Sequence, residues 1–226
     1  MTGDSQRVPS GVKRGAMVVL AAVVLALVAS SDVLHGWLLE WLAYAETVIR
    51  GQPLLGKVLF VAFAAGSAMF AFVSSAVVVP VAVLAWGKAV SMLLLWVGWI
   101  LGGVCAYGVS RYLGRRVVRW MLSEAVIASY ERLIPRDAPF GLIVLFQTAL
   151  PSEVPGYLLG LARYPFKKFL VALAIAELPY AVATIYFGES FLERRMFVLI
   201  GTGIAMAVFS GWTLHWLRGR VGAPKA

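Results

Sequence analysis

Residues 146–160 read FQTALPSEVPGYLLG, an apolar segment that carries a glutamate between two prolines. Pro151 and Pro155 both oppose an uninterrupted helix, because proline lacks a backbone N–H and restricts the residue before it. A carboxylate at membrane depth is costly unless it is paired or faces water. The stretch therefore predicts two short helices with a break near Glu153, where irregular backbone lines a polar cavity.

The overall composition indicates what kind of protein contains this segment. Of the 226 residues, 61% are hydrophobic and 14% are charged, and the mean hydropathy is +0.86. Soluble domains are far less apolar, so the sequence predicts an integral membrane protein. The net charge of +9 comes from short basic clusters beside apolar segments. Membrane topology explains such clusters without a nucleic-acid partner.

The sequence offers no ligand set for a metal or a cofactor. A single cysteine forms neither a disulfide framework nor a Cys-based metal site. His35 and His215 fall near opposite membrane surfaces in the predicted topology, with no second ligand nearby. No nucleotide-binding loop, zinc motif or Ser-His-Asp pattern occurs. We therefore expect no metal, no cofactor and no enzymatic activity.

Apolar segments of the required length predict the membrane spans. A full span needs about 20 apolar residues, and three segments fit, namely 90–110, 169–188 and 196–217. The apolar segment near the N-terminus resembles a signal peptide, but no small-x-small cleavage site precedes Asp32, so we predict an uncleaved first span. The Trp-rich stretch after it predicts an amphipathic helix on the membrane surface, over residues 32–50.

Two further apolar segments are interrupted, and we interpret each as a re-entrant hairpin. They cover residues 53–87, broken around Ser74, Ser75 and Pro80, and residues 139–160. With the N-terminus in the cytoplasm, this topology places 15 of the 20 Lys and Arg residues inside, in clusters of three, six, three and three. It therefore satisfies the positive-inside rule. The inside residues are Arg7, Lys13, Arg14, Arg111, Arg115, Arg116, Arg119, Arg132, Arg136, Arg163, Lys167, Lys168, Arg218, Arg220 and Lys225.

The predicted fold is therefore an all-α polytopic membrane protein, a helical bundle with two opposed re-entrant hairpins. Because the hairpins enter from opposite faces and each precedes a full span, their order is that of an inverted repeat. The two hairpins share a serine shortly before a Val-Pro pair, which selects Pro80 in the first and Ser152 in the second. We predict a cytoplasmic tail over 1–16, one membrane domain over 17–217 with its core at about 50–190, and a cytoplasmic tail over 218–226.

Two stretches resemble the DedA superfamily, also called VTT-domain or SNARE-associated Golgi proteins. The first is GWILGGVCAYGVSRYLGRRV, and the second is ALPSEVPGYLLGLARYPFKKFLVALAIAELPYAVATIYFG. The matching residues are Tyr107, Arg111, Leu113, Gly114, Arg115, Tyr157, Gly160, Pro165, Phe166, Leu178 and Pro179. The resemblance covers about residues 50–190. It implies movement of lipids across bilayers, either flipping of undecaprenyl phosphate or phospholipids, or phospholipid scrambling.

Two features depart from the family pattern. Relatives usually carry an arginine near the start of the second hairpin, where the nearest polar residue here is Gln147, and many carry an acid in the first hairpin, which has none here. The acids of this chain are instead Glu153 in the second hairpin and Glu177 in the middle of the next span. Burial favours the protonated form of a carboxyl. Each is therefore either a proton-coupling group or a neutral acid that holds helices together.

The remaining candidate residues are those suited to an anionic headgroup. The broken helices aim backbone amides at the gap, and Gly156 permits close backbone approach unless it serves helix packing. Arg111 ends a span where its guanidinium can fork onto a phosphate, although topological anchoring is the alternative. Gln147 and Tyr157 complete the set of binding or coupling candidates in the second hairpin.

We expect a multi-pass protein of the plasma or inner membrane, with both termini cytoplasmic. Its expected partners are membrane lipids and protons, with an anionic lipid such as a polyprenyl phosphate as the cargo. Three alternatives remain open on the sequence. They are uncoupled phospholipid scrambling, a non-transporting role in membrane assembly or quality control, and exchange of small ions or solutes through the same buried acids.

Overall fold

The structure is a computed structural model that describes residues 40, 51–70, 75–121, 127, 138–150, 153–193 and 195–221. Its described elements are all helical, which confirms the predicted all-α class. The predicted first span and nearly all of the predicted surface helix lie outside the described residues, as do the predicted N-terminal tail and residues 222–226. The elements are α3 (Pro53–Met69), η1 (Ser75–Val77), α4 (Val79–Leu113), α5 (Arg115–Met121), α7 (Phe140–Ala149), α8 (Glu153–Leu161), α9 (Phe166–Leu192) and α10 (Met196–Val221).

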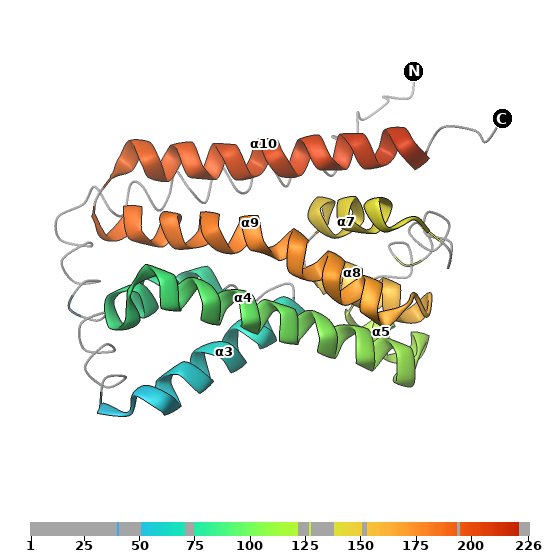
Figure 1. Ribbon diagram of the computed structural model, residues 1–226, viewed down its shortest axis with the longest axis horizontal. Coiled ribbons are helices and arrows are strands. Elements are labelled where there is room, and N and C mark those ends of the chain that lie inside the picture. The colour runs from blue at the N-terminus through green and yellow to red at the C-terminus, as the bar shows by residue number, and fades with distance from the viewer. Residues whose placement is uncertain are drawn as a thin grey trace, which may run out of the picture.

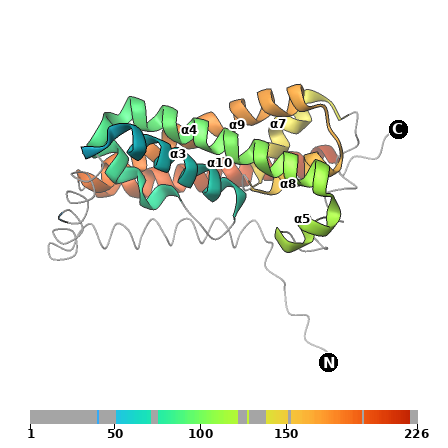
Figure 2. The same ribbon diagram turned by 90° about the horizontal axis from the view of Figure 1, so that it is seen from below.

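The long helices lie side by side along the long axis of the molecule, in the order α10, α9, α4 and α3 (Figure 1). The shorter helices α7 and α8 occupy one end of this row, where α7 packs against α9 and α10 and α8 packs against α4. At the same end, the chain turns away from α4 into α5 (Figure 2). Gly114, with a φ of 74°, makes that turn in a backbone conformation that favours glycine.

The surface of the long helices is apolar. Among the described residues, α4 and α9 are long and apolar enough to cross a membrane. On α9, the large side chains of Val171, Ile175 and Leu178 recur at helical spacing and are 42–51% exposed. Because soluble monomers rarely expose continuous apolar stripes of this kind, the surface supports the predicted membrane protein. Predicted spans 90–110, 169–188 and 196–217 each lie within one helix.

The helical segment over residues 146–160 is broken at the place that its two prolines predicted. Helix α7 ends at Ala149, the next residue Leu150 is extended with a φ of −116° and a ψ of 154°, and α8 begins at Glu153. The residues that flank the two helices meet, because the Tyr164 hydroxyl, after α8, donates to the Ala138 carbonyl, before α7, over 3.1 Å. The chain therefore turns back on itself between these helices. Its placement as a re-entrant hairpin in a bilayer remains a prediction.

The other interrupted segment also reverses direction. Helix α4 contains a break at Gly87, whose φ of 75° and ψ of 168° are not helical. Gly98 of α4 lies against Ala64 of α3, and Gly102 lies against Ala65, so α3 and the later part of α4 run parallel. Two parallel helices that follow each other in the sequence require the chain to return between them, and the described part of this connection holds η1 and the part of α4 before Gly87. The predicted symmetry between the two interrupted segments is not tested by this arrangement.

Each interrupted segment has its own hydrophobic core. The larger core gathers side chains of α7, α8, the start of α9 and the later part of α4, with Phe146, Tyr157, Leu159 and Phe169 almost wholly buried. The smaller core joins α3 and both parts of α4 to the later part of α9 and contains Phe60, Ala64, Val79, Ala82, Leu95, Ala181 and Ile185. The breaks therefore lie in two separately packed halves of one bundle.

Candidate functional site

The end of α3, at the first break, contacts α8, the helix that follows the second break. The Tyr157 hydroxyl, in the first turns of α8, donates to the carbonyl of Met69 at the end of α3 over 3.3 Å. From the other side of the first break, Ser75 accepts a hydrogen bond of 3.0 Å from the Trp99 indole N–H. We call the four residues of these two contacts, Met69, Ser75, Trp99 and Tyr157, the break junction. It is a place where helices end inside an apolar bundle.

Glycines allow α8 to lie in direct contact with α4. A Cβ atom added at Gly160 would lie 1.9 Å from the Ser110 hydroxyl oxygen and 2.4 Å from the Tyr107 carbonyl oxygen. One added at Gly156 would lie 2.9 Å from the Ala106 Cβ. Both glycines thus serve close helix packing, the alternative that the sequence left open. Contact of Gly156 with a headgroup remains a prediction.

Two of three glycines in the later part of α4 also serve close packing. A Cβ at Gly102 would lie 2.3 Å from the Ala65 carbonyl oxygen, and one at Gly103 would lie 2.7 Å from Leu173. Gly108 differs, because a Cβ added there meets nothing within 4 Å. Packing therefore explains Gly102 and Gly103 and leaves Gly108 without a structural role in the described contacts.

Gln147 presents an acceptor that no described group satisfies. It lies in the last turn of α7, almost completely buried, and its side-chain amide donates to the Phe169 carbonyl over 3.2 Å. Its Oε1 atom is buried and has no hydrogen-bond partner in the described structure. Nearby hydroxyl groups donate elsewhere, since the Thr148 hydroxyl donates to the Val144 carbonyl and the Tyr180 hydroxyl donates to the Thr148 carbonyl. A buried acceptor without a donor is destabilising by about 1–3 kcal/mol.

Glu177 is buried in α9, as the sequence predicted for an acid in the middle of a span. Its exposed fraction is 6%. It lies one helical turn after Leu173, which contacts Gly103 of α4, so the two side chains share a face of α9. Three residues later on α9, Tyr180 bonds to the end of α7. Glu177 therefore occupies the part of α9 that borders both α4 and the second break.

The other predicted site residues of the two breaks do not gather at one point. Pro80 is buried near α9, where its nitrogen would lie 3.6 Å from a Cβ at Gly188. Glu153 is the first residue of α8, but the structure does not describe its side chain, and Ser152 lies outside the described residues. Gln147 and Tyr157 thus lie on the two helices that flank the second break, Glu177 lies on α9, and Pro80 lies in the other half.

Arg111 lies at the end of α4, beside the turn that joins α8 to α9. Its guanidinium donates to the Tyr107 hydroxyl and lies 5.7 Å from that ring's centroid, and the same hydroxyl donates to the Tyr164 carbonyl. Phe169 stacks on the Tyr107 ring at 4.6 Å. Arg111 is thus held in place by an aromatic group, without a carboxylate partner among the described contacts.

Three exposed basic side chains surround the same end of the bundle. Arg163 lies in the α8–α9 turn with a φ of 54°, a left-handed conformation uncommon for residues other than glycine. Lys167 and Lys168 follow in the first turn of α9. We call these three residues and Arg111 the basic mouth. Arg111 and the junction residue Trp99 are separated by twelve residues of helix, which is about 18 Å along α4, so the basic mouth is distinct from the break junction.

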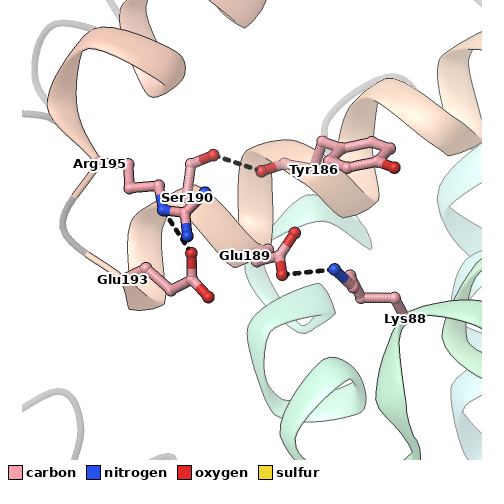
Figure 3. Close-up of polar contacts among 6 residues, drawn as sticks. All are labelled: Lys88, Tyr186, Glu189, Ser190, Glu193 and Arg195. Carbon is pink, nitrogen blue, oxygen red and sulfur yellow. Dashed lines mark hydrogen bonds and ion pairs between the residues drawn. The ribbon is translucent and has the colours of Figure 1, made fainter.

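The opposite ends of α4 and α9 carry an ion pair that the sequence analysis missed (Figure 3). The Lys88 ammonium lies 2.8 Å from the Glu189 carboxylate and 5.9 Å from the centroid of the Tyr186 ring. Glu193 pairs with Arg195 at 2.6 Å just after α9. A signal was present in the sequence, because Lys88 and Glu189 each follow a glycine at the outer end of a predicted span.

Comparison with known families identifies one match. The family model for the VTT domain matches residues 60–190, which extend from α3 almost to the end of α9. No curated protein and no solved structure matches the chain. The matched range includes both helix breaks, the basic mouth and Glu177, so the whole candidate site lies inside the domain.

Proposed function

The chain belongs to the VTT-domain family, and from this premise we propose that it translocates lipids across a cell membrane. The proposed cargo is an anionic lipid such as undecaprenyl (polyprenyl) phosphate, and its movement is coupled to protons. The observation that carries the proposal is the break junction, where two interrupted helical segments meet inside an apolar bundle through Tyr157 and Met69. Interrupted helices that meet inside a bundle are typical of transporter substrate sites.

The basic mouth suits the phosphate of an approaching lipid. Arg111 uses its guanidinium to contact Tyr107 and no described carboxylate, so further N–H donors of the planar group are available to an anion. Arginine binds phosphate in a bidentate manner, and exposed lysines add long-range attraction for anionic lipids. The exposed Phe166 ring contacts Tyr107 at 5.5 Å and provides an apolar surface beside the charges. A phosphate and an acyl or prenyl chain would therefore both find partners there.

The interior of the site suits proton coupling. Glu177 is a buried acid on the helix that borders the second break, and Gln147 holds an unsatisfied acceptor on the facing helix. A carboxyl in such surroundings changes its charge when a phosphate or water approaches. In this proposal Glu177 takes up a proton from water as the anionic headgroup enters the junction, because a nearby like charge disfavours the carboxylate, and it returns the proton to water once the headgroup has left and the site is hydrated. Glu153 is the second candidate for the same role.

Uncoupled scrambling of phospholipids is the second candidate function, and one observation favours it. Neither α7 nor α8 contains Lys or Arg, and the same is true of residues 91–110 and 169–188 in α4 and α9. A bare phosphate at the junction would thus meet no cation in these segments, whereas a zwitterionic phospholipid needs none. Scrambling would use the same apolar bundle and breaks without a role for Glu177 in coupling.

Reconstituted vesicles with a labelled lipid test the proposal. We expect protein-dependent movement of labelled polyprenyl phosphate that is accelerated by a proton gradient. Glu177→Gln should lower that movement by about tenfold or more, since a hydrogen bond to a charged group contributes roughly 1.5–3 kcal/mol and 1.36 kcal/mol is a tenfold change in rate. Equal rates with and without the gradient would support scrambling. No protein-dependent movement of either lipid class would remove translocation altogether and favour the assembly role.

A further inference from the structure

At the end of the bundle that lies opposite the basic mouth, one turn of α9 contacts α4. Gly188 in this turn packs against the first residue of α4, because a Cβ added there would lie 2.7 Å from a Val79 methyl group. The next residue, Glu189, pairs with Lys88 on the far side of the break in α4. A single turn of α9 thus contacts α4 both at its start and just after the break at Gly87.

Gly87 can act as a hinge between these two contacts. Its φ of 75° and ψ of 168° lie in a region that only glycine occupies readily, and they separate residues 79–86 from the long part of α4. A Cβ added at Gly87 would meet nothing within 4 Å, so no described group is packed against this position. The segment before the hinge leads back to Ser75 at the break junction.

The ion pair has the strength expected of a reversible contact. The Lys88 side chain is 53% exposed and the Glu189 side chain is 18% exposed, so water can solvate both charges once they separate. Exposed ion pairs contribute little to stability, and the cation–π contact with Tyr186 adds modestly to it. Such a contact holds α4 and α9 together and still separates easily.

We propose that Lys88 and Glu189 form a latch that closes the Gly87 end of the bundle over the break junction. Opening of the latch lets the last turns of α9 move away from both parts of α4, which frees Val79 from Gly188, allows residues 79–86 to turn about Gly87 and exposes Ser75. The positive-inside rule assigns this end to the outer side of the membrane. The latch rests on the proposed translocation, in which it closes the exit farthest from the basic mouth and prevents free passage between the two sides.

Cysteine accessibility tests the latch without any measurement of lipid movement. In a Cys105→Ala chain in lipid nanodiscs, which expose both faces, a single Ser75→Cys reports on opening through its rate of reaction with a membrane-impermeant maleimide. We expect Lys88→Gln or Glu189→Gln to raise that rate about three- to fivefold, the population shift that loss of an exposed ion pair produces. The exchanged pair, Lys88→Glu with Glu189→Lys, should restore the low rate.

The chain supplies two matched controls. Glu193→Gln removes the neighbouring ion pair with Arg195, which joins no two helices, and should leave the rate at Ser75→Cys unchanged. A single Ile143→Cys reports on the core of the other half, where the native side chain is wholly buried, and should react slowly in every variant.

Three results would overturn the latch. These are an unchanged Ser75→Cys rate after loss of either partner, failure of the exchanged pair to restore it, or an equal rise at Ile143→Cys, which would indicate general loosening. Because labelling requires no transported lipid, absence of translocation in vesicles would refute the proposed function and leave the labelling result standing.

Discussion

The two ends of the bundle are held together by different kinds of contact. At the basic mouth, α8 lies directly on α4 through glycines, and Tyr107 and Tyr164 bond to backbone carbonyls across the turn. At the Gly87 end, an exposed ion pair joins α4 to α9 beside the contact of Gly188 with Val79, and α4 itself is broken at Gly87. Close packing has one favourable arrangement, whereas a solvated ion pair exchanges easily with water. The mouth is therefore expected to stay rigid while the Gly87 end moves.

Gly160→Ala should lower stability more than any other change proposed below, because it disrupts the close packing of α8 on α4 at the rigid end. The added methyl would lie 1.9 Å from Ser110 Oγ and 2.4 Å from a backbone oxygen, so α8 and α4 must separate. We expect a loss of at least about 3 kcal/mol of stability, the upper range for overpacking. Thermal unfolding in detergent measures it. Gly108→Ala, which meets nothing within 4 Å, is the matched control and should unfold at or above the native temperature.

Gly87→Ala probes the movable end and should have a smaller effect of a different kind. The space around Gly87 is open, so the penalty is conformational and amounts to about 1–3 kcal/mol for a residue forced into this region. We expect a moderate fall in thermal stability together with slower lipid movement, because the hinge is stiffened or shifted. Native rates of movement in vesicles would contradict a hinge at this position.

Tyr107→Phe removes the hydroxyl that links the mouth to Arg111 and should cost less again. The Tyr164 carbonyl loses a buried donor and Arg111 loses its acceptor, which together predict a loss of about 1–2 kcal/mol. Burial raises the pKa of Tyr164, so its own hydroxyl stays a donor to Ala138 and the turn remains closed. Tyr112→Phe, at a site 84% exposed, is the control that should leave unfolding unchanged.

Gln147→Leu should change stability least, so its effect on lipid movement can be measured separately from its effect on folding. It removes a buried acceptor that lacks a donor together with one hydrogen bond to Phe169, and these opposing effects leave a change of less than about 1 kcal/mol. Lipid movement should nevertheless fall if the Oε1 atom meets the headgroup or its water. Gln147→Asn preserves the amide and is the control for chemistry. Unchanged movement in the leucine variant would exclude Gln147 from the site.

Much of the arrangement near the second break could be predicted from local chemistry. The two prolines predicted the break between α7 and α8. The cost of exposing a carboxyl group to the apolar membrane interior predicted that Glu177 in a span would be buried. The bond between Arg111 and Tyr107 joins residues four apart on one helix, a spacing at which side chains regularly meet.

Long-range contacts could not be predicted in the same way. Tyr157 and Met69 lie 88 positions apart, and no periodicity or motif relates them. Lys88 and Glu189 are likewise joined only through the packing of α4 against α9. Gly102 and Gly108 occupy similar sequence surroundings, yet only Gly102 faces a neighbouring helix, because the crossing point of α3 and α4 decides which glycine is covered.

Photo-cross-linking of a lipid to the native chain would show whether lipids pass through the break junction. A polyprenyl phosphate with a diazirine beside its phosphate would be irradiated in vesicles that contain the protein, and the labelled peptides identified by mass spectrometry. If lipids pass through the break junction, label should concentrate on the peptides that contain Met69, Gln147 and Tyr157. Label confined to the exposed apolar faces of α9 and α10, at Val171, Ile175 and Phe197, would contradict a route through the bundle.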